Sequence, residues 1–296
     1  MKTVTALVRR NVKLFFADKM MFLASMMTPI ILITLFVTFL GQVYRDSLLS
    51  SIPEGIEISE KLIDGFVFGW LFSSLLAVCT VTVSFCSNLL MVQDKTNGAR
   101  DDLDVSPVGG SHIALAYFTA SAISTLIICF VALAVCLVIL AFTGWYLTVS
   151  DVLMTASVTV LLVLFGTALS SIIGHFLTTQ GQMSALSAII SSVYGFICGA
   201  YMPISQFSSV IRNVISVLPG TYGTSLLHTY LMRGVYRELE GLIPAEAVNG
   251  LKEAFDSEMS VFGHAVNEWQ MLTILILSVL VLTAVYVILC KNGKRR

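Results

Sequence analysis

The chain has 296 residues, 56% of them hydrophobic, with a formal net charge of −1 and a mean hydropathy of +0.89. Its 17 Lys and Arg and 18 Asp and Glu residues all lie outside six long apolar stretches. This segregation excludes a soluble globular protein and leaves no room for a separate soluble domain. A charge at mid-membrane is costly and usually marks an ion or proton pathway. Energy for any uphill transport is therefore expected from another source.

Each apolar stretch is long enough to cross a bilayer, which takes about 20 helical residues. We therefore predict an all-α integral membrane protein with six transmembrane helices. Residues 1–19 would form an amphipathic segment and residues 20–296 a six-span membrane domain. The predicted spans are residues 20–43, 66–91, 113–142, 152–176, 183–202 and 269–289.

The N-terminal segment is strongly amphipathic when placed on a helical wheel. Its apolar face would carry Val4, Val8, Val12, Phe15 and Phe16, and its basic face Lys2, Arg9, Arg10 and Lys13. This pattern predicts an interfacial helix on the inner leaflet, with the apolar face in lipid. An ordinary basic flank of the first span explains the charges but not the apolar face.

Orientation follows from the distribution of Lys and Arg between the two sides. With the N-terminus inside, 11 of these residues lie on the inner side and six on the outer side. Both termini are therefore predicted to be cytoplasmic, in a multi-pass protein of the plasma (inner) membrane.

The sequence offers no catalytic or metal site. Five of the six cysteines lie inside apolar stretches, and the four histidines have no partner at metal-ligand spacing. Buried thiols of this kind are usually packing residues. We expect no catalytic residue and no metal in this chain.

The most polar cytoplasmic loop, residues 92–112, predicts a short helix. Thr96 or Asn97 would cap it, and Asp101 and Asp102 would suit its first turn. Ser106-Pro107 and the following glycine pair would end it. If the helix began one turn earlier, Asp94 and Gly98 would share a face with these two acids. Contact with a cytoplasmic protein and a merely solvated loop both remain open.

Small residues recur at every fourth position of the fifth predicted span. They are Ser187, Ser191, Gly195 and Gly199. This spacing lets two helix backbones approach closely in lipid. It predicts a helix interface, either between subunits or within the chain.

The segment before the last span, residues 203–268, begins with apolar residues interrupted by Pro219. The pieces on either side are too short to cross the membrane alone, and one continuous crossing would place the basic tail outside. We therefore predict a re-entrant helical pair, which is tolerated where protein covers the broken backbone. The outer loop 234–268 contains a predicted helix near 245–255, and serves either as a lid over an exit or as a solvated cap.

Two stretches carry a family resemblance. The loop Asp94-Lys95-x-x-Gly98-x-x-x-Asp102-Leu103-x-x-Ser106-Pro107-Val108 resembles the segment after the second span of type-2 ATP-binding-cassette (ABC) exporter permeases. Gly199-x-x-x-Pro203, then Pro219-Gly220-Thr221-Tyr222 and a helix ending at Arg233-Gly234, is similar to the block before that family's last span. The order of these elements extends the likeness over essentially the whole chain.

The chain also departs from the family pattern. Ser208 stands where the family often has a proline, and Gln93-Asp94 replaces its usual glutamate. The first outer loop is short, unlike that of subfamilies with a large extracellular domain. These departures bear on the subfamily.

The resemblance implies two six-span permease subunits paired with two cytoplasmic ATPase subunits. Helix 94–105 would be the coupling helix, with ATPase-coupling residues Asp94, Lys95, Gly98, Arg100, Asp101, Asp102 and Leu103. Spans 2 and 5 would flank the translocation path, with wall candidates Phe68, Phe72, Tyr194, Pro203, Pro219 and Tyr222. The exported compound would be an amphiphilic drug or antibiotic, a lipid or a peptide, and the permease pair a homodimer or a heterodimer.

The sequence contains no G-x-x-x-x-G-K-[ST] phosphate loop, because Gly293-Lys294 is followed by Arg295. ATP and Mg are therefore expected in a partner subunit, with no cofactor in this chain and no nucleic acid partner. The main rival interpretation is a secondary carrier or channel not powered by ATP. Such proteins usually show midplane acids or internal repeats, and we detect neither. A membrane-embedded enzyme lacks support, since the spans hold no carboxylate pair or Ser/His set.

Overall fold

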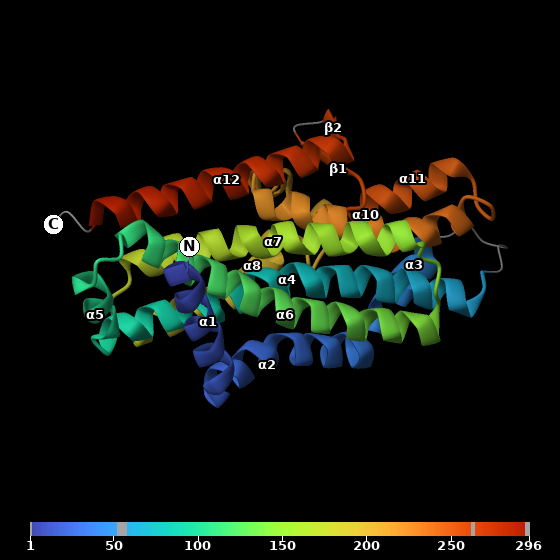
Figure 1. Ribbon diagram of the computed structural model, residues 1–296. Helices are drawn as coiled ribbons and strands as arrows, with labels where there is room; N and C mark the ends of the chain where they lie inside the picture. The colour runs from blue at the N-terminus through green and yellow to red at the C-terminus, as the bar shows by residue number, and fades with distance from the viewer. Residues whose placement is uncertain (1, 52–57, 262–263, 294–296) are drawn as a thin grey trace.

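The computed structural model describes residues 2–51, 58–261 and 264–293, and these form a long helical bundle (Figure 1). The first half contains α1 (Lys2–Ala17), α2 (Lys19–Leu35), the π-helical turn η1 (Phe36–Leu40), α3 (Gly41–Ser51), α4 (Glu60–Thr96), α5 (Ala99–Val105) and α6 (Gly110–Thr143). The second half contains α7 (Val149–Phe176), α8 (Gln180–Ile197), the 3-10 turn η2 (Ile204–Gln206), α9 (Ser209–Ile215), α10 (Pro219–Leu239), α11 (Ala245–Ala254) and α12 (Glu268–Gly293). Between α11 and α12, β1 (Met259–Val261) and β2 (His264–Val266) pair antiparallel.

Five helical segments in the described residues are long and apolar enough to cross a membrane. They are Lys19–Ser50, Glu60–Thr96, Gly110–Thr143, Val149–Phe176 and Glu268–Lys291. These correspond to the predicted spans 1, 2, 3, 4 and 6. The chain is thus a helical, multi-pass membrane protein, and α8 occupies the position of the remaining predicted span.

Helix α8 ends earlier than the sequence predicts. It stops at Ile197, because Gly199 adopts a left-handed conformation with φ +77°. The N–H groups of Ala200 and Tyr201 then bond back to the Gly195 carbonyl, at 2.9 and 3.0 Å. This is the usual way in which a glycine satisfies the free carbonyls of a helix end.

The first span is longer than predicted. It passes through Pro29 and the π-helical turn η1 and continues into α3, so residues 44–51 are helical rather than loop. A π turn inserts an extra residue without breaking the helix. Tertiary packing stabilises the extension, because Tyr44 lies against Trp70 with ring centroids 4.3 Å apart and Leu48 is buried.

Helix α4 forms the centre of the bundle and packs against α2, α6, α7, α8 and α10 (Figure 1). Its contact with α7 is close, because a Cβ at Gly166 would lie 2.9 Å from the Thr80 carbonyl oxygen. Polar groups fill the same interface. Asn88 Nδ2 donates to Ser171 Oγ at 3.0 Å, and Ser84 Oγ shares a 3.3 Å hydrogen bond with Thr167. Small residues and interhelical hydrogen bonds are what hold helices together in lipid.

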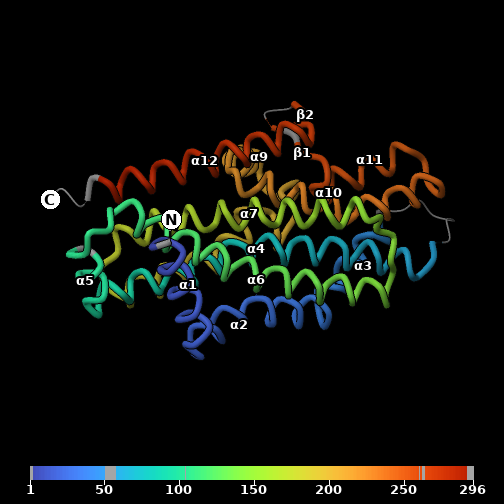
Figure 2. The backbone as a smooth tube through the Cα atoms, viewed as in Figure 1, coloured from blue at the N-terminus to red at the C-terminus, as the bar shows by residue number. Residues whose placement is uncertain are grey.

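Helix α1 crosses the bundle at a steep angle, as Figures 1 and 2 show. This orientation fits the predicted interfacial helix. The prediction that its apolar face lies in lipid is wrong in part. Phe15 and Asn11 are buried against the protein, where α1 packs on α6, while Val8 and Val12 are half-buried.

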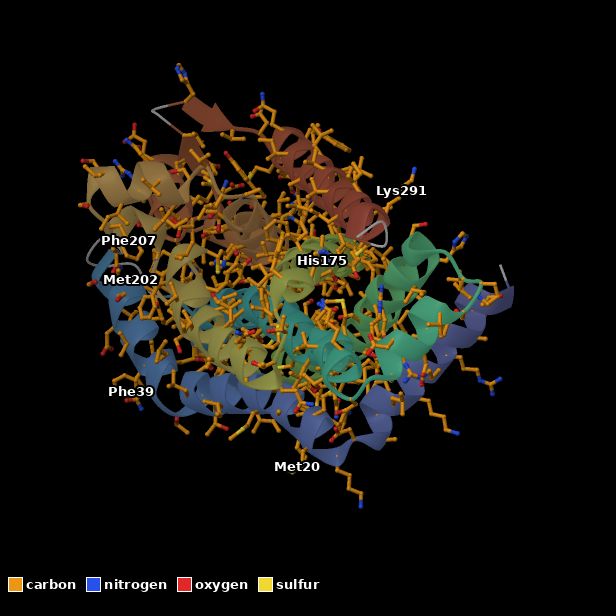
Figure 3. The ribbon with its side chains drawn as sticks, turned by 90° about the vertical axis from the view of Figure 1, so that its left-hand side faces the viewer. Met20, Phe39, His175, Met202, Phe207 and Lys291 are labelled. Atoms are coloured by element: carbon orange, nitrogen blue, oxygen red, sulfur yellow. The ribbon has the colours of Figure 1, made fainter. Side chains whose placement is uncertain are left out.

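The two ends of the bundle differ. Helix α5, the start of α1 and the end of α12 lie toward one end, and α3 and α11 lie toward the other (Figures 1 and 2). Figure 3 views the molecule from the α5 side, with His175 inside the bundle and Met20 and Phe39 at its rim. Met20 and Phe39 are 76% and 65% exposed, as expected for side chains that face lipid.

The predicted break at Pro219 is present in the structure. It separates the short α9 from α10, which is longer than expected and reaches Leu239. Proline suits the first turn of a helix, because the N–H it lacks would have no helical partner there. Helix α10 packs deeply against α4, α7 and α12.

The segment after α11 is anchored to the bundle and is not a solvated loop. Phe255 is 5% exposed, and its ring meets Phe66 edge-on at 4.8 Å. Trp70 Nε1 donates to the Phe255 carbonyl at 3.2 Å, and Ser225 Oγ donates to the Asp256 carbonyl at 2.8 Å. We call residues 245–261 and 264–266 the outer cap, since they are joined to α4 and α10 by these contacts.

Asp256 fastens the outer cap to η2. Its φ is +56°, and its Oδ2 accepts the Ile204 N–H at 2.5 Å. Burial raises the pKa of Asp256 to about 7, while hydrogen bonds from the N–H groups of Ile204 and Ser205 oppose this shift. The side chain therefore keeps its proton into the neutral range.

This pKa predicts a pH-dependent stability. The folded chain holds the Asp256 proton up to about pH 7, whereas an unfolded aspartate loses it near about pH 4. Unfolding therefore becomes easier as pH rises between these values, by at most about 4 kcal/mol in total. We expect the thermal midpoint in detergent to fall from about pH 5 to about pH 8, and the Asp256→Asn variant to lose this component.

Asp46→Asn, on the exposed surface of α3, is the matched control and should keep the wild-type profile. The same slope in wild type and in Asp256→Asn would contradict the assignment.

Candidate functional site

The predicted coupling segment is built from two helices and not from one helix over 94–105. Helix α4 continues to Thr96, and α5 begins at Ala99 after Gly98, whose φ is +78°. The predicted cap by Thr96 or Asn97 is wrong, because Thr96 Oγ1 donates to the Gln93 carbonyl and Asn97 ends α4. Nothing lies within 4 Å of a Cβ built at Gly98. The glycine is therefore needed for its backbone conformation.

Asp94 points into the bundle. It is 5% exposed and accepts hydrogen bonds from Arg10 Nη1 at 2.6 Å, Arg10 Nη2 at 3.3 Å and the Tyr117 hydroxyl at 2.5 Å. The Asp94 carboxylate raises the pKa of Arg10 through these contacts. This forked arginine–carboxylate pair is a strong form of hydrogen bond. It joins α1, α4 and α6.

Lys95 also points inward. Its Nζ donates to the carbonyls of Gly174, His175 and Leu177, at 2.9, 2.8 and 3.2 Å. These are free carbonyls at the end of α7, where a cation is favourable. The geometry gives Asp94 and Lys95 positioning roles at the base of α5.

The remaining predicted coupling residues lie on α5 itself. Asp101 and Asp102 are exposed, and Arg100 lies over the Tyr117 ring at 5.8 Å. Leu103 is half-buried and packs against the apolar cluster at this end of the bundle. Sequence reasoning missed Val105, which is 87% exposed. The available signal was that Val105 is an apolar residue on a short, acidic helix, where an exposed apolar side chain indicates a contact surface.

The same end of the bundle holds a second contact that the sequence did not indicate. His175, in the middle of the view in Figure 3, has its Nδ1 3.6 Å from Cys290 Sγ on α12. In the part of the chain that the structure describes, no group of three or more His, Cys, Asp or Glu side chains could hold a metal ion.

The predicted wall residues occupy different environments. Phe68 is half-buried and stacks on Phe72 with centroids 5.6 Å apart, and Phe72 is fully buried in the core of the chain. Pro203 is buried where η2 begins. Of these three residues, Phe68 alone has surface to offer a passing molecule.

Tyr194 and Pro219 line an apolar cavity of about 380 Å³ between α7, α8, α10 and α12. The Tyr194 hydroxyl is buried, and no described residue bonds to it. Tyr222 is buried and borders another cavity, of about 590 Å³, beside β2 and α12. The structure thus places three of the predicted wall residues around α10.

The small residues of α8 and of the turn after it face the rest of the chain. Ser187 and Ser191 are half-buried, and Gly195 and Gly199 are buried. A Cβ at Gly195 would collide with the Tyr201 ring, and one at Gly199 with Ile204. At the two glycines, the close contact is therefore within the chain.

The comparison with known families agrees with this architecture. The ABC-2 type transporter family matches residues 2–232, which run from α1 into α10. The chain belongs to the ABC-2 type transporter family. It is a permease, the membrane subunit of an ABC transporter, in a family that works with ABC ATPase partners. A search of curated proteins finds no match. The outer cap and α12 of the permease lie beyond the matched residues.

The Arg10–Asp94 pair predicts a specific loss of stability. Arg10→Ala would leave the Asp94 carboxylate buried without its cation. We expect a loss of about 1–3 kcal/mol in unfolding free energy, since Arg10 is partly exposed. Denaturant unfolding in detergent, followed by tryptophan fluorescence, measures it.

Arg9→Ala is the matched control, because Arg9 is exposed on the same helix. The double variant Arg10→Ala, Asp94→Asn should recover part of the loss, because it removes the unpaired charge. Equal losses of stability in Arg9→Ala and Arg10→Ala would argue against a stabilising role for the Arg10–Asp94 pair.

Proposed function

We propose that this permease exports an amphiphilic compound, such as a drug or antibiotic, a lipid or a peptide. Two permease copies, identical or different, would form the path, and separate cytoplasmic subunits would bind ATP and Mg and hydrolyse the nucleotide. The family assignment and the missing phosphate loop support this division of labour.

In the proposed topology both termini are cytoplasmic and α8 is the fifth of six spans. Helices α9 and α10 form the re-entrant pair. Support comes from the basic residues near both chain ends and from the position of α5 at the same end of the bundle. The short length of α9 and the break at Pro219 fit a segment that enters the membrane without crossing it.

The observation that carries the proposal is the presentation of α5. This helix has seven residues and lies between two spans, with Asp101, Asp102 and Val105 on its exposed surface. Asp94 and Lys95 hold the end of α4 that leads into α5. A displacement of α5 would therefore be transmitted to α4 and α7. An ATPase subunit would seat on this surface.

Two substitutions test the coupling role. Proline at Gly98 cannot adopt φ +78°, and Val105→Asp alters an exposed side chain that the fold does not use. We expect both variants to insert normally but to lose transport by about tenfold or more, a loss of at least about 1.4 kcal/mol in coupling. Leu103→Asp, which removes the packing under α5, should act in the same way.

Gly98→Asn is the control, because asparagine tolerates the left-handed conformation. The measurement is substrate-stimulated ATP hydrolysis and transport in vesicles that contain the permease and its ATPase. Full coupling in the Gly98→Pro and Val105→Asp variants would show that α5 is not part of the interface with the ATPase subunit. Transport without any ATPase would instead support a carrier or channel.

Substitutions at Tyr194 and Phe72 should distinguish a residue that lines the translocation path from one that only packs in the core. Tyr194→Phe removes only a buried hydroxyl that lacks a partner, so stability should be kept. It should weaken ATPase stimulation by substrates with a hydrogen-bond acceptor more than by purely apolar ones. Phe72→Ala should instead cost about 3–5 kcal/mol of stability, with the substrate profile unchanged. Identical substrate profiles for wild type and Tyr194→Phe would show that Tyr194 does not line the translocation path.

A further inference from the structure

A small polar cavity lies where α1 packs on α4 and α6 (Figure 1). The space open to the centre of a water molecule is about 10 Å³, and one bound water needs roughly 10–15 Å³. Polar side chains from all three helices line this cavity, and each is at most 5% exposed: Asn11, Ser87, Asn88, Tyr117, Ser121 and Ser124. The cavity therefore has the size and the lining of a hydration site inside the bundle.

Two of these side chains carry buried polar atoms without a partner among the described residues. Asn88 Nδ2 donates to the Thr167 carbonyl and to Ser171 Oγ on α7, at 3.4 and 3.0 Å, but Asn88 Oδ1 accepts no hydrogen bond from the described residues. Ser121 Oγ on α6 has no such partner either. Buried polar atoms are normally satisfied by protein groups or by ordered water. An acceptor and a hydroxyl beside one cavity therefore point to a shared ligand.

Water is the ligand that fits these two atoms. One molecule can donate to the carbonyl oxygen of Asn88 and accept from the hydroxyl of Ser121, so that both atoms are satisfied together. No carboxylate is among the described residues that line the cavity. A cation bound there would be buried without a counter-charge, which is costly.

We propose that this cavity binds one structural water molecule, which joins α4 to α6 where α1 covers them. The water would donate to Asn88 Oδ1 and accept from Ser121 Oγ. Asn11 and Phe15 of α1 are 2% and 1% exposed and line the same cavity. The N-terminal helix therefore separates the site from its surroundings.

The proposed water adjoins the Arg10–Asp94 pair. Tyr117 lines the cavity and donates to Asp94 at 2.5 Å, and Asn11 Oδ1 accepts from Arg10 Nη1 at 2.8 Å. Asn88 precedes Asp94 by six residues, which is roughly 9 Å along a helix. The junction of α1, α4 and α6 would thus be held at two levels, by the ion pair near the end of α4 and by water further inside the bundle.

X-ray footprinting of the full-length permease in nanodiscs tests the site directly. Irradiation converts water into hydroxyl radicals, and mass spectrometry then identifies the side chains that were oxidised beside it. Met91 lines the cavity and is 3% exposed. Met232 on α10 is fully buried and does not line this cavity, so it is the internal control. We expect Met91 to be oxidised several-fold faster than Met232.

The Ser121→Val variant should lower the oxidation of Met91 to the level of Met232. Its methyl groups would occupy the cavity, and its side chain offers no hydroxyl to the water. Denaturant unfolding confirms that the variant is folded. Unchanged oxidation of Met91 in the folded variant would overturn the proposal, as would equal oxidation of Met91 and Met232 in the wild type.

A stability comparison tests the same water without oxidation. Ser121→Ala removes one partner of the water, so the unfolding equilibrium constant in denaturant should rise about fivefold. Ser74→Ala is the matched control, because Ser74 Oγ is also buried without a partner among the described residues but does not line the cavity. Removing an unpaired hydroxyl should leave the unfolding constant unchanged or lower it. A loss in Ser121→Ala no larger than in Ser74→Ala would contradict the water bridge.

Discussion

The close contact between α4 and α7 determines how the other helices are arranged. In lipid, apolar surfaces gain little from meeting each other, so helix association depends on tight packing and interhelical hydrogen bonds. Gly166 provides the close approach, and Asn88 and Ser84 provide the polar contacts to α7. With α4 fixed in this way, α2, α6, α8 and α10 pack around it, and most of its residues are buried.

The two ends of α4 connect the functional parts of the permease. At one end, Asp94 and Lys95 tie α4 to α1, α6 and the end of α7, directly before the turn at Gly98. At the other end, Phe66 and Trp70 hold the outer cap through Phe255. A helix of 37 residues extends over about 55 Å. One continuous element therefore joins the proposed ATPase contact to the outer cap at the opposite end of the bundle.

The outer cap is joined to the bundle by hydrogen bonds from three elements. Side chains from α4 and α10 bond to its backbone at Phe255 and Asp256, and the Asp256 carboxyl bonds to η2. The apolar cavity at Tyr194 and the cap both adjoin α10.

The sequence alone determined the membrane class, the extents of most spans, the amphipathic α1, the break at Pro219 and a short helix after the second long span. Each of these depends on a local property, such as the length of an apolar run or the backbone limits of proline. The ATP-binding-cassette family could be proposed from ordered motifs, since these also survive in sequence. The family match confirms that resemblance.

Only the tertiary structure decided which way the side chains face. A span that is apolar on every side gives no periodic signal, so the complete burial of Phe72 was not predictable. Asp94 and Lys95 look solvent-exposed in sequence, because their hydrogen-bond partners come from distant segments: the Tyr117 hydroxyl donates to Asp94, and the carbonyls that end α7 accept from Lys95. The left-handed turn at Gly199 that ends α8 likewise lies against distant residues, since a Cβ built there would lie 2.7 Å from Ile204 and 3.3 Å from Asp256. Such partners are fixed by packing and hydrogen bonding between helices, which composition and spacing do not encode.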